Sequence, residues 1–373
     1  MKVLIAGGGV AGLTLASLLR PRGHQITVVD PGHGSDDGYA LALWPHGTRV
    51  LHAVGVHDRL VERGLPMRRY TARSGSGALL TTSGPPAGIA RHGYLGTVPR
   101  GDLVEMLATV CDHVEHRTGR IVALQQHHAS VDARLDDGTT IEADLLVGAD
   151  GIGSAVRTAL LGPQPRHDTG WTCATWWTAA ADHPGDAGET LEFWGAGSFV
   201  GCYPCRGRSC LIVGGPSDTV RGPQSRAWLR RTLTGAGLPA DRLLPDSDDE
   251  RWLWPMTDVR ATRWVRGRVA LVGDAAAAFL PTAGMGASMA LESAAALADE
   301  LSRCDAGHVP LALRRYERRR KGRVERAQRQ SRHFARALFT SSSTLARLRN
   351  GLVARMSVDR LLDPLVRDLE HPA

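Results

Sequence analysis

Three glycine-rich segments hold the residues of this chain whose types and spacing are best suited to chemistry. They are Ala6–Gly12 (AGGGVAG), Gly148–Arg157 (GADGIGSAVR) and Gly273–Gly286 (GDAAAAFLPTAGMG). Glycines let backbone N–H groups come close to a phosphate, and a strand-like apolar run precedes each segment. Their order and spacing predict a bound dinucleotide cofactor.

The first segment fits the pattern G-x-G-x-x-G through Gly7, Gly9 and Gly12. It lies between an apolar strand and an apolar helix, which we expect at Lys2–Ala6 and Leu13–Leu19. In this pattern the glycines permit a tight turn, close approach to a pyrophosphate, and packing of the helix on the strand. The next strand, Gln25–Val29, ends at Asp30, whose carboxylate would bind a ribose hydroxyl and disfavour a 2′-phosphate. This site should therefore prefer FAD or NAD to NADP.

The second and third segments can bind the same dinucleotide as the first only if a sheet brings all three together. Each follows an expected strand and leads into an expected helix, so each offers a further close approach to a dinucleotide. The strands are expected at Thr118–Gln126, Ser130–Leu135, Thr139–Glu142, Asp144–Val147 and Arg268–Val272, and the helices at Ser154–Leu161 and Ala287–Leu301. Together with the first segment they predict FAD.

These motifs resemble those of the FAD-dependent monooxygenases of the p-hydroxybenzoate hydroxylase fold. The resemblance rests on AGGGVAG with Asp30, VPRGDLVEML at Val98–Leu107, GADGIGSAVR and GDAAAAFLPTAGMG, and it extends over nearly the whole chain. Trp44–Gly55 and Trp254–Asp274 match as well. The chain looks most similar to single-component urate- and salicylate-type hydroxylases.

The resemblance implies a cofactor role for particular residues. Asp30 would bind the adenosine ribose, Arg100 the pyrophosphate or ribityl region, and Asp274 a ribityl hydroxyl. Asp150 and Gly151 would lie where the cofactor and the nicotinamide dock, and Arg157 would brace that segment. The predicted cofactor-binding residues are Gly7, Gly9, Val10, Ala11, Gly12, Asp30, Pro31, Ala42, Arg100, Val122, Asp150, Gly151, Gly273, Asp274, Pro281, Gly284, Met285, Gly286 and Ala287.

The third segment departs from the family pattern. Ala277 stands where many members have His, and Met285 and Ser288 stand where Gln and Asn are usual. Pro31 occupies a position where Arg is common. Backbone groups and Asp274 still suffice for FAD, so these changes bear on substrate position and on oxygen chemistry.

The resemblance also implies a reaction. NADH or NADPH would reduce FAD, dioxygen would form a C4a-hydroperoxide, and an aromatic or polycyclic substrate would be hydroxylated or epoxidised. The single dinucleotide fingerprint is already assigned to FAD, so the nicotinamide cofactor would bind without a Rossmann domain of its own. An oxidase, reductase or cyclase acting on a similar intermediate is the alternative, and a non-catalytic flavin-binding protein is a further one. A halogenase would need a lysine near the flavin, and the only lysines are Lys2 and Lys321.

The predicted fold is α/β: a Rossmann-like FAD domain with an inserted, mostly antiparallel substrate sheet and a long C-terminal helix. A chain of 373 residues exceeds the size at which one core usually keeps growing. We expect an FAD-binding domain at residues 1–66, 99–164 and 266–305, a substrate domain at 67–98 and 165–265, and a helical region at 306–373. Strands of the substrate sheet are expected at Thr172–Thr178, Thr190–Trp194, Phe199–Tyr203 and Cys210–Val213.

Aromatic side chains are concentrated in this substrate region and favour an apolar, ring-shaped substrate. The predicted pocket residues are Trp176, Phe193, Phe199, Tyr203, Met256 and Pro281. Tyr203 is the candidate catalytic residue, because its hydroxyl would orient or deprotonate a phenol if it faced the flavin. No histidine is singled out as a base, and no metal-ligand spacing is present.

Composition argues against nucleic-acid binding, a disulfide-rich fold and a membrane span. The net charge of +7 is carried almost entirely by arginine. Its densest run, Arg314–Arg336, is expected to be one long helix with a solvated basic face, and it has few interleaved aromatics for stacking nucleic acid bases. The six cysteines are expected to be reduced thiols. No apolar run approaches the roughly 20 residues of a membrane span, and no export signal is visible, so we expect a cytoplasmic protein of open oligomeric state.

Overall fold

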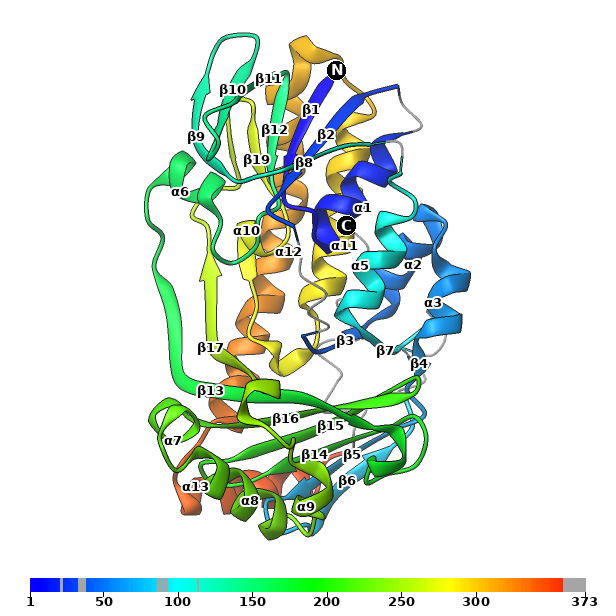
Figure 1. Cartoon of the computed structure of the whole chain (residues 1–373), viewed down its shortest axis with the longest axis vertical. Helices are drawn as coiled ribbons and strands as arrows, with labels where there is room; N and C mark the ends of the chain where they lie inside the picture. Colours follow the sequence, from blue (N-terminus) through cyan, green and yellow to red (C-terminus); the bar gives the residue numbers. More distant parts are fainter. Residues whose placement is uncertain (21–22, 33–37, 86–88, 90–92, 113, 358–373) are drawn as a thin grey trace.

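The computed structural model describes residues 1–20, 23–32, 38–85, 89, 93–112 and 114–357. Figure 1 shows a six-stranded sheet in the upper half of the molecule and a seven-stranded sheet in the lower half. The long helix α12 (Val309–Leu338) runs beside both. The predicted α/β class, with an inserted sheet and a long C-terminal helix, is confirmed. The predicted domain limits stay a prediction.

Distant parts of the chain meet in the six-stranded sheet, whose order is β18-β19-β12-β1-β2-β8. Its strands are β1 (Lys2–Ala6), β2 (Gln25–Asp30), β8 (Glu115–Thr118), β12 (Leu145–Gly148), β18 (Val265–Arg266) and β19 (Val269–Leu271). Neighbouring strands are parallel except for β18 and β19. A parallel sheet covered on both faces needs continuous apolar strands, and β12 is buried at every residue. The carboxyl ends of β1, β12 and β19 therefore bring the three glycine-rich segments to one edge.

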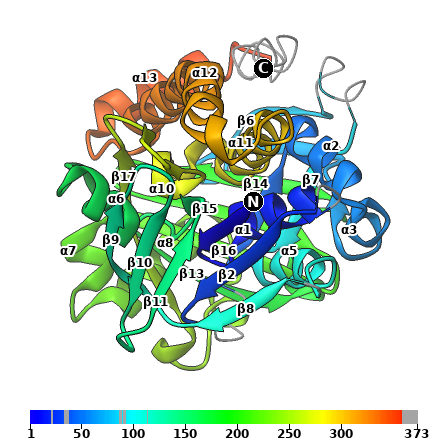
Figure 2. The same ribbon diagram turned by 90° about the horizontal axis from the view of Figure 1, so that it is seen from above.

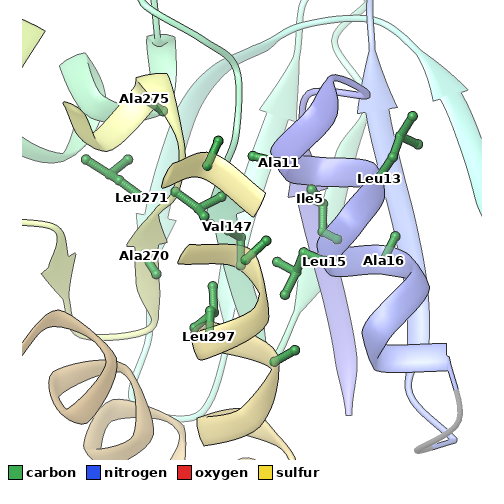
Figure 3. Packing of buried hydrophobic residues seen from close by; sticks show 14 of the residues in the cluster. Ile5, Ala11, Leu13, Leu15, Ala16, Val147, Ala270, Leu271, Ala275 and Leu297 are labelled. Carbon is green, nitrogen blue, oxygen red and sulfur yellow. The ribbon is translucent and has the colours of Figure 1, made fainter. Parts of the chain in front are cut away.

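Two helices pack on this sheet and on each other. They are α1 (Val10–Leu19) and α11 (Gly286–Leu301), and α12 packs against α11 in turn (Figure 2). Figure 3 shows Leu15 of α1 and Leu297 of α11 packed among Ile5, Val147 and Leu271 of the sheet. Helix α1 begins at Val10, three residues before the predicted start at Leu13.

Shorter elements complete the upper half. A small sheet has the order β11-β10-β9 and another has the order β3-β7-β4. The strands and helices are β3 (Ala40–Leu43), β4 (Leu65–Pro66), β7 (Gly96–Pro99), β9 (Ile121–Gln126), β10 (Val131–Leu135), β11 (Thr140–Ala143), α2 (Pro45–Val54), α3 (His57–Arg63), α5 (Arg100–Ala108), α6 (Ala155–Leu161) and α10 (Asp274–Ala277). The single strand predicted at Thr118–Gln126 is wrong: β8 ends at Thr118, and Gly119, with a φ of 152°, turns the chain into β9.

The seven-stranded sheet has the order β17-β13-β16-β15-β14-β5-β6. Its strands are β5 (Arg69–Ser74), β6 (Leu79–Ser83), β13 (Arg166–Ala179), β14 (Glu189–Trp194), β15 (Phe199–Cys205), β16 (Arg208–Pro216) and β17 (Trp252–Arg260). All neighbours are antiparallel except β5 and β14. Helices α7 (Ser217–Arg221), α8 (Ser225–Gly235) and α9 (Ala240–Leu243) lie on the outer side of this sheet (Figure 1).

Helix α12 joins the two halves. Arg332 of α12 binds Asp258 of β17 through two hydrogen bonds, Nε to Oδ2 at 2.7 Å and Nη2 to Oδ1 at 2.5 Å. The predicted solvated face needs a correction, because Arg320 and Arg323 are buried and pair with Glu292 of α11. Beyond α12, α13 (Ser343–Val353) returns to the seven-stranded sheet.

Candidate active site

One cavity of about 590 Å³ connects the glycine-rich edge of the six-stranded sheet with the inner face of the seven-stranded sheet. The structure brings most of the predicted cofactor residues to its wall. Those that line it are Gly7, Gly9, Val10, Ala11, Asp30, Pro31, Ala42, Arg100, Asp150, Gly151, Asp274, Pro281, Gly284, Gly286 and Ala287.

Four predicted cofactor residues do not line the cavity. Gly12 lies behind its wall, where a side chain would collide with the carbonyl group of Gly7. Val122 is 51% exposed, because it points to the other face of β9 from Ile121, which does line the cavity. Met285 is buried at the start of α11, and Gly273 turns the chain at a φ of 61° against Ala11.

The first glycine-rich segment forms a cradle at the start of α1. Gly7 has a φ of 107°, and a side chain there would collide with the carbonyl group of Ala149, so only glycine fits. Nothing lies within 4 Å of the position that a Gly9 side chain would occupy, and no side chain caps α1. The first backbone N–H groups of α1 and its positive dipole end thus face the cavity, where a phosphate would fit.

Asp30 ends β2 beside this cradle. Its Oδ2 accepts a hydrogen bond from the N–H of Gly8 at 2.6 Å, and its Oδ1 accepts one from the N–H of Gly32 at 2.9 Å. These bonds fix the carboxylate at the cavity wall. Such a carboxylate is suited to bind ribose hydroxyls.

Asp274 lines the cavity, and its side chain is accessible there although it lies deep within the protein. Burial raises its pKa to about 6, against the lowering effect of Arg100 and Arg157. The guanidinium of Arg157 donates to the carbonyl groups of Ala275 at 3.0 Å and Ile152 at 2.6 Å. Arg157 thereby joins the second glycine-rich segment to the third.

Trp44 supplies a polar atom that the sequence did not single out. Its indole lines the cavity beside Gly284, and its buried Nε1 has no hydrogen-bond partner among the described residues. A buried donor without a partner is energetically costly, so Nε1 of Trp44 is a candidate donor to a bound ligand.

The lower end of the cavity holds a cluster of three hydrogen-bond donors around Glu192. Tyr203 donates to Oε1 of Glu192 at 2.9 Å, Tyr70 donates to Oε2 at 2.7 Å, and Nε1 of Trp194 donates to Oε2 at 2.9 Å. Burial, followed by the nearby Glu192 carboxylate, raises the pKa of Tyr70 and of Tyr203 well above the ordinary value. The predicted deprotonation of a phenol by Tyr203 is therefore unfavourable, whereas an orienting role fits the geometry.

Strand alternation explains which aromatic residues reach this end. Four of the six predicted pocket residues line the cavity, namely Phe199, Tyr203, Met256 and Pro281. The other two, Trp176 and Phe193, lie outside it. These two belong to the apolar cluster beneath α8 and α9, where Trp176 donates to the carbonyl group of Leu243 at 2.6 Å. We leave both out of the proposed substrate pocket. Cavity-wall residues that the predicted site left out include Tyr39, Trp44, Tyr70, Glu192, Trp194 and Trp254.

The signal for Glu192 was present in the sequence. Side chains of β14 alternate between two faces: Leu191 and Phe193 lie on one, and Thr190, Glu192 and Trp194 lie on the other. The acidic residue Glu192 on the second face indicates that this face meets the cavity. Tyr70 lies far away in the sequence, and only the parallel pairing of β5 with β14 brings it near.

Comparison with known proteins shows the family of this chain. The family model described as FAD binding domain matches residues 1–331. The chain belongs to this FAD-binding family. It is 30% identical over 369 residues to 3-amino-4-hydroxybenzoate 2-monooxygenase PtmB3 of Streptomyces platensis, which covers 94% of this chain and 91% of the relative. It is 28% identical over 372 residues to 3-hydroxybenzoate 6-hydroxylase 1 of Aquipseudomonas alcaligenes, covering 95% and 94%.

A solved structure that contains FAD is also similar to this chain. HpxO of Klebsiella pneumoniae, complexed with FAD and uric acid, matches with a TM-score of 0.89 and 25% identity, covering 100% of this chain and 97% of that chain. The predictions of the family, of FAD as the cofactor and of an FAD-dependent monooxygenase are confirmed.

The described residues contain no group of three or more His, Cys, Asp or Glu side chains that could hold a metal ion. No helix in the described ranges is long and apolar enough to cross a membrane.

Proposed function

We propose that this FAD-dependent monooxygenase uses NADH or NADPH and dioxygen to hydroxylate a small aromatic molecule. The observation that supports this proposal best is one continuous cavity, which is lined at one end by the cradle of α1 and at the other by aromatic side chains of the seven-stranded sheet. The names of the relatives, which include monooxygenases of hydroxylated benzoates, support an aromatic substrate.

The residues present fit FAD. The cradle at Gly7 and Gly9 would hold the diphosphate, and Asp30 would bind the adenosine ribose. Asp274 would accept from the ribityl chain, and Nε1 of Trp44 would donate to the flavin ring. When bound, FAD supplies the chemistry that activates oxygen.

The chain itself would position and protect the reacting groups. Gly284 and Gly286 line the cavity at the start of α11, whose first N–H groups and dipole favour negative charge at that point. The aromatic wall, which includes Trp194, Phe199 and Met256, would exclude water from the substrate. Tyr203, held by Glu192, would orient a polar group on the ring.

A turnover experiment tests this proposal. The FAD-loaded protein is mixed with NADH or NADPH and aromatic compounds under dioxygen, and nicotinamide oxidation is followed. We expect a compound that is hydroxylated to accelerate this oxidation. Conversion of the compound without incorporation of oxygen would instead support one of the alternatives. It would support a reductase if nicotinamide is consumed, and an oxidase or cyclase if it is not.

A further inference from the structure

The Glu192 cluster, formed by Tyr70, Glu192, Trp194 and Tyr203, has an unusual balance of donors and acceptors. A tyrosine hydroxyl and an indole each have one hydrogen to donate, and all three hydrogens are directed to Glu192. Burial raises the pKa of the Glu192 carboxyl group, and the three hydrogen bonds oppose this effect by favouring its ionised form. That form has about four lone-pair positions, of which these bonds take three. The lone pairs that remain on Glu192 and on the two tyrosine oxygens can only accept.

Basic side chains near the Glu192 cluster could offset this excess of acceptors. The basic side chains that line the cavity, within the described ranges, are Arg100, Arg120 and Arg349. Arg100 begins α5 and interacts with Asp274, and Arg120 follows Gly119 after β8, so both belong to the cofactor end.

Arg349 reaches the cluster from α13 but is already saturated. Its Nη1 donates to the carbonyl groups of Ala337 and Leu338 at 3.1 and 3.0 Å. Its Nη2 donates to those of Trp194 and Gly195 at 2.8 and 3.1 Å, and its Nε donates to Asn350 at 3.0 Å. A guanidinium has five N–H donors, and all five are used here. Arg349 therefore fixes α13 on β14 and has no donor left for a ligand carboxylate.

We infer that the Glu192 cluster selects aromatic substrates that present an O–H or N–H donor to it, such as a phenol, an arylamine or a ring N–H, and rejects a ring carboxylate at that position. This inference rests on the proposed function, because it names the substrate class of the same cavity. A ring carboxylate would face the Glu192 carboxylate without a free cation, and like charges in a desolvated site repel strongly. A donor would instead complete the acceptor set and form a charge-assisted hydrogen bond.

Three matched ligands test this inference: phenol, aniline and benzoate share a ring and differ in the group that meets the cluster. Each is titrated into the FAD-loaded protein without NADH or NADPH, and binding is measured from the change in flavin absorbance and in tryptophan fluorescence. We expect phenol and aniline to bind about tenfold or more tightly than benzoate. Preferential binding of benzoate, equal binding of the three, or binding of none overturns the inference.

Two variants locate the effect. Glu192→Gln keeps the shape but removes the charge and places an N–H₂ group in the cluster, so the preference for phenol and aniline should fall about tenfold. Glu189→Gln is the matched control, because Glu189 lies on the same strand but outside the cavity, where it accepts from Thr71. An unchanged preference in Glu192→Gln would overturn the inference, and the wild-type ranking decides it even if that variant does not load with FAD. Failure of the proposed function gives a different result, namely an FAD-loaded protein that ranks the ligands as expected but transfers no oxygen.

Discussion

The hydroxyl of Ser288 accepts a hydrogen bond from the backbone N–H of Trp44 at 2.9 Å. Ser288 is fully buried in the first turn of α11, and Trp44 is the residue before α2. This bond joins the start of α11, just after the third glycine-rich segment, to Trp44, which lines the cavity. Ser288, which stands where the family pattern has Asn, thus has a specific hydrogen-bond partner in this protein.

A larger side chain at position 288 should destabilise the protein. A side chain at Gly47 would meet Ser288 at 2.6 to 2.8 Å, which shows how closely α2 and α11 pack there. We expect Ser288→Asn to lower the free energy of unfolding by about 1–3 kcal/mol through overpacking. Ser288→Ala, which only loses the bond to Trp44, should lose about 1 kcal/mol. Urea unfolding of the FAD-free proteins measures both, and an Asn variant as stable as the wild type would contradict this packing.

The indole of Trp44 should contribute to FAD affinity. Trp44→Phe removes the unpartnered Nε1 from the cavity wall, so FAD should bind about 2- to 10-fold more weakly. Trp264→Phe is the control, because Nε1 of Trp264 is also buried without a partner in the described part of the chain but lies outside the cavity. Titration of FAD into the two apoproteins compares them. An equal loss of FAD affinity in both variants would show that the Trp44 indole does not contact the cofactor.

Two glycines of the first segment should respond differently to alanine. Gly7→Ala forces a side chain into the backbone at Ala149 at a positive φ, so both stability and FAD binding should be lost. Gly9 has a φ of −83° and open space beside it, so Gly9→Ala should fold normally. Its new methyl group would project toward the phosphates and weaken FAD binding about tenfold or more. Thermal unfolding and FAD titration separate these outcomes, and undiminished FAD affinity in Gly9→Ala would contradict the cradle.

His46 should make the apoprotein sensitive to acid. It is a buried residue of α2 near Glu292 of α11 and Arg320 and Arg323 of α12, and neither ring nitrogen has a hydrogen-bond partner among the described residues. Burial lowers the pKa of His46 to about 4, although Glu292 opposes this effect. The unfolded state binds the proton first, near pH 6.5, so stability is full above that pH and falls as the pH drops toward about 4.

The loss over this interval should be about 3 kcal/mol. His46→Leu, which cannot titrate, should remove this part of the pH dependence. Denaturant unfolding of both apoproteins at several pH values measures the difference. Parallel stability curves for the wild type and the variant would show that His46 does not carry the effect.

The sequence predicts the cofactor end of the molecule better than the substrate end. Gly7, Gly9 and Asp30 act through local geometry, a turn and a strand end, so their spacing alone reveals them. Glu192 and Tyr70 come together only through the pairing of β14 with β5, which no local pattern specifies. The placement of Phe193 outside the cavity has the same origin, because period-2 alternation shows that two faces exist but not which one meets the cavity. The burial of Arg320 depends likewise on Glu292, a residue of another helix.

The most direct test of the central proposal is the fate of isotopically labelled dioxygen. The FAD-loaded protein is incubated with NADH or NADPH, labelled dioxygen and aromatic compounds that carry hydroxyl or amino groups, and the products are analysed by mass spectrometry. We predict that one labelled oxygen atom enters the product ring for each nicotinamide consumed in coupled turnover. A product formed at the expense of NADH or NADPH without labelled oxygen would contradict the monooxygenase reaction proposed for this cavity.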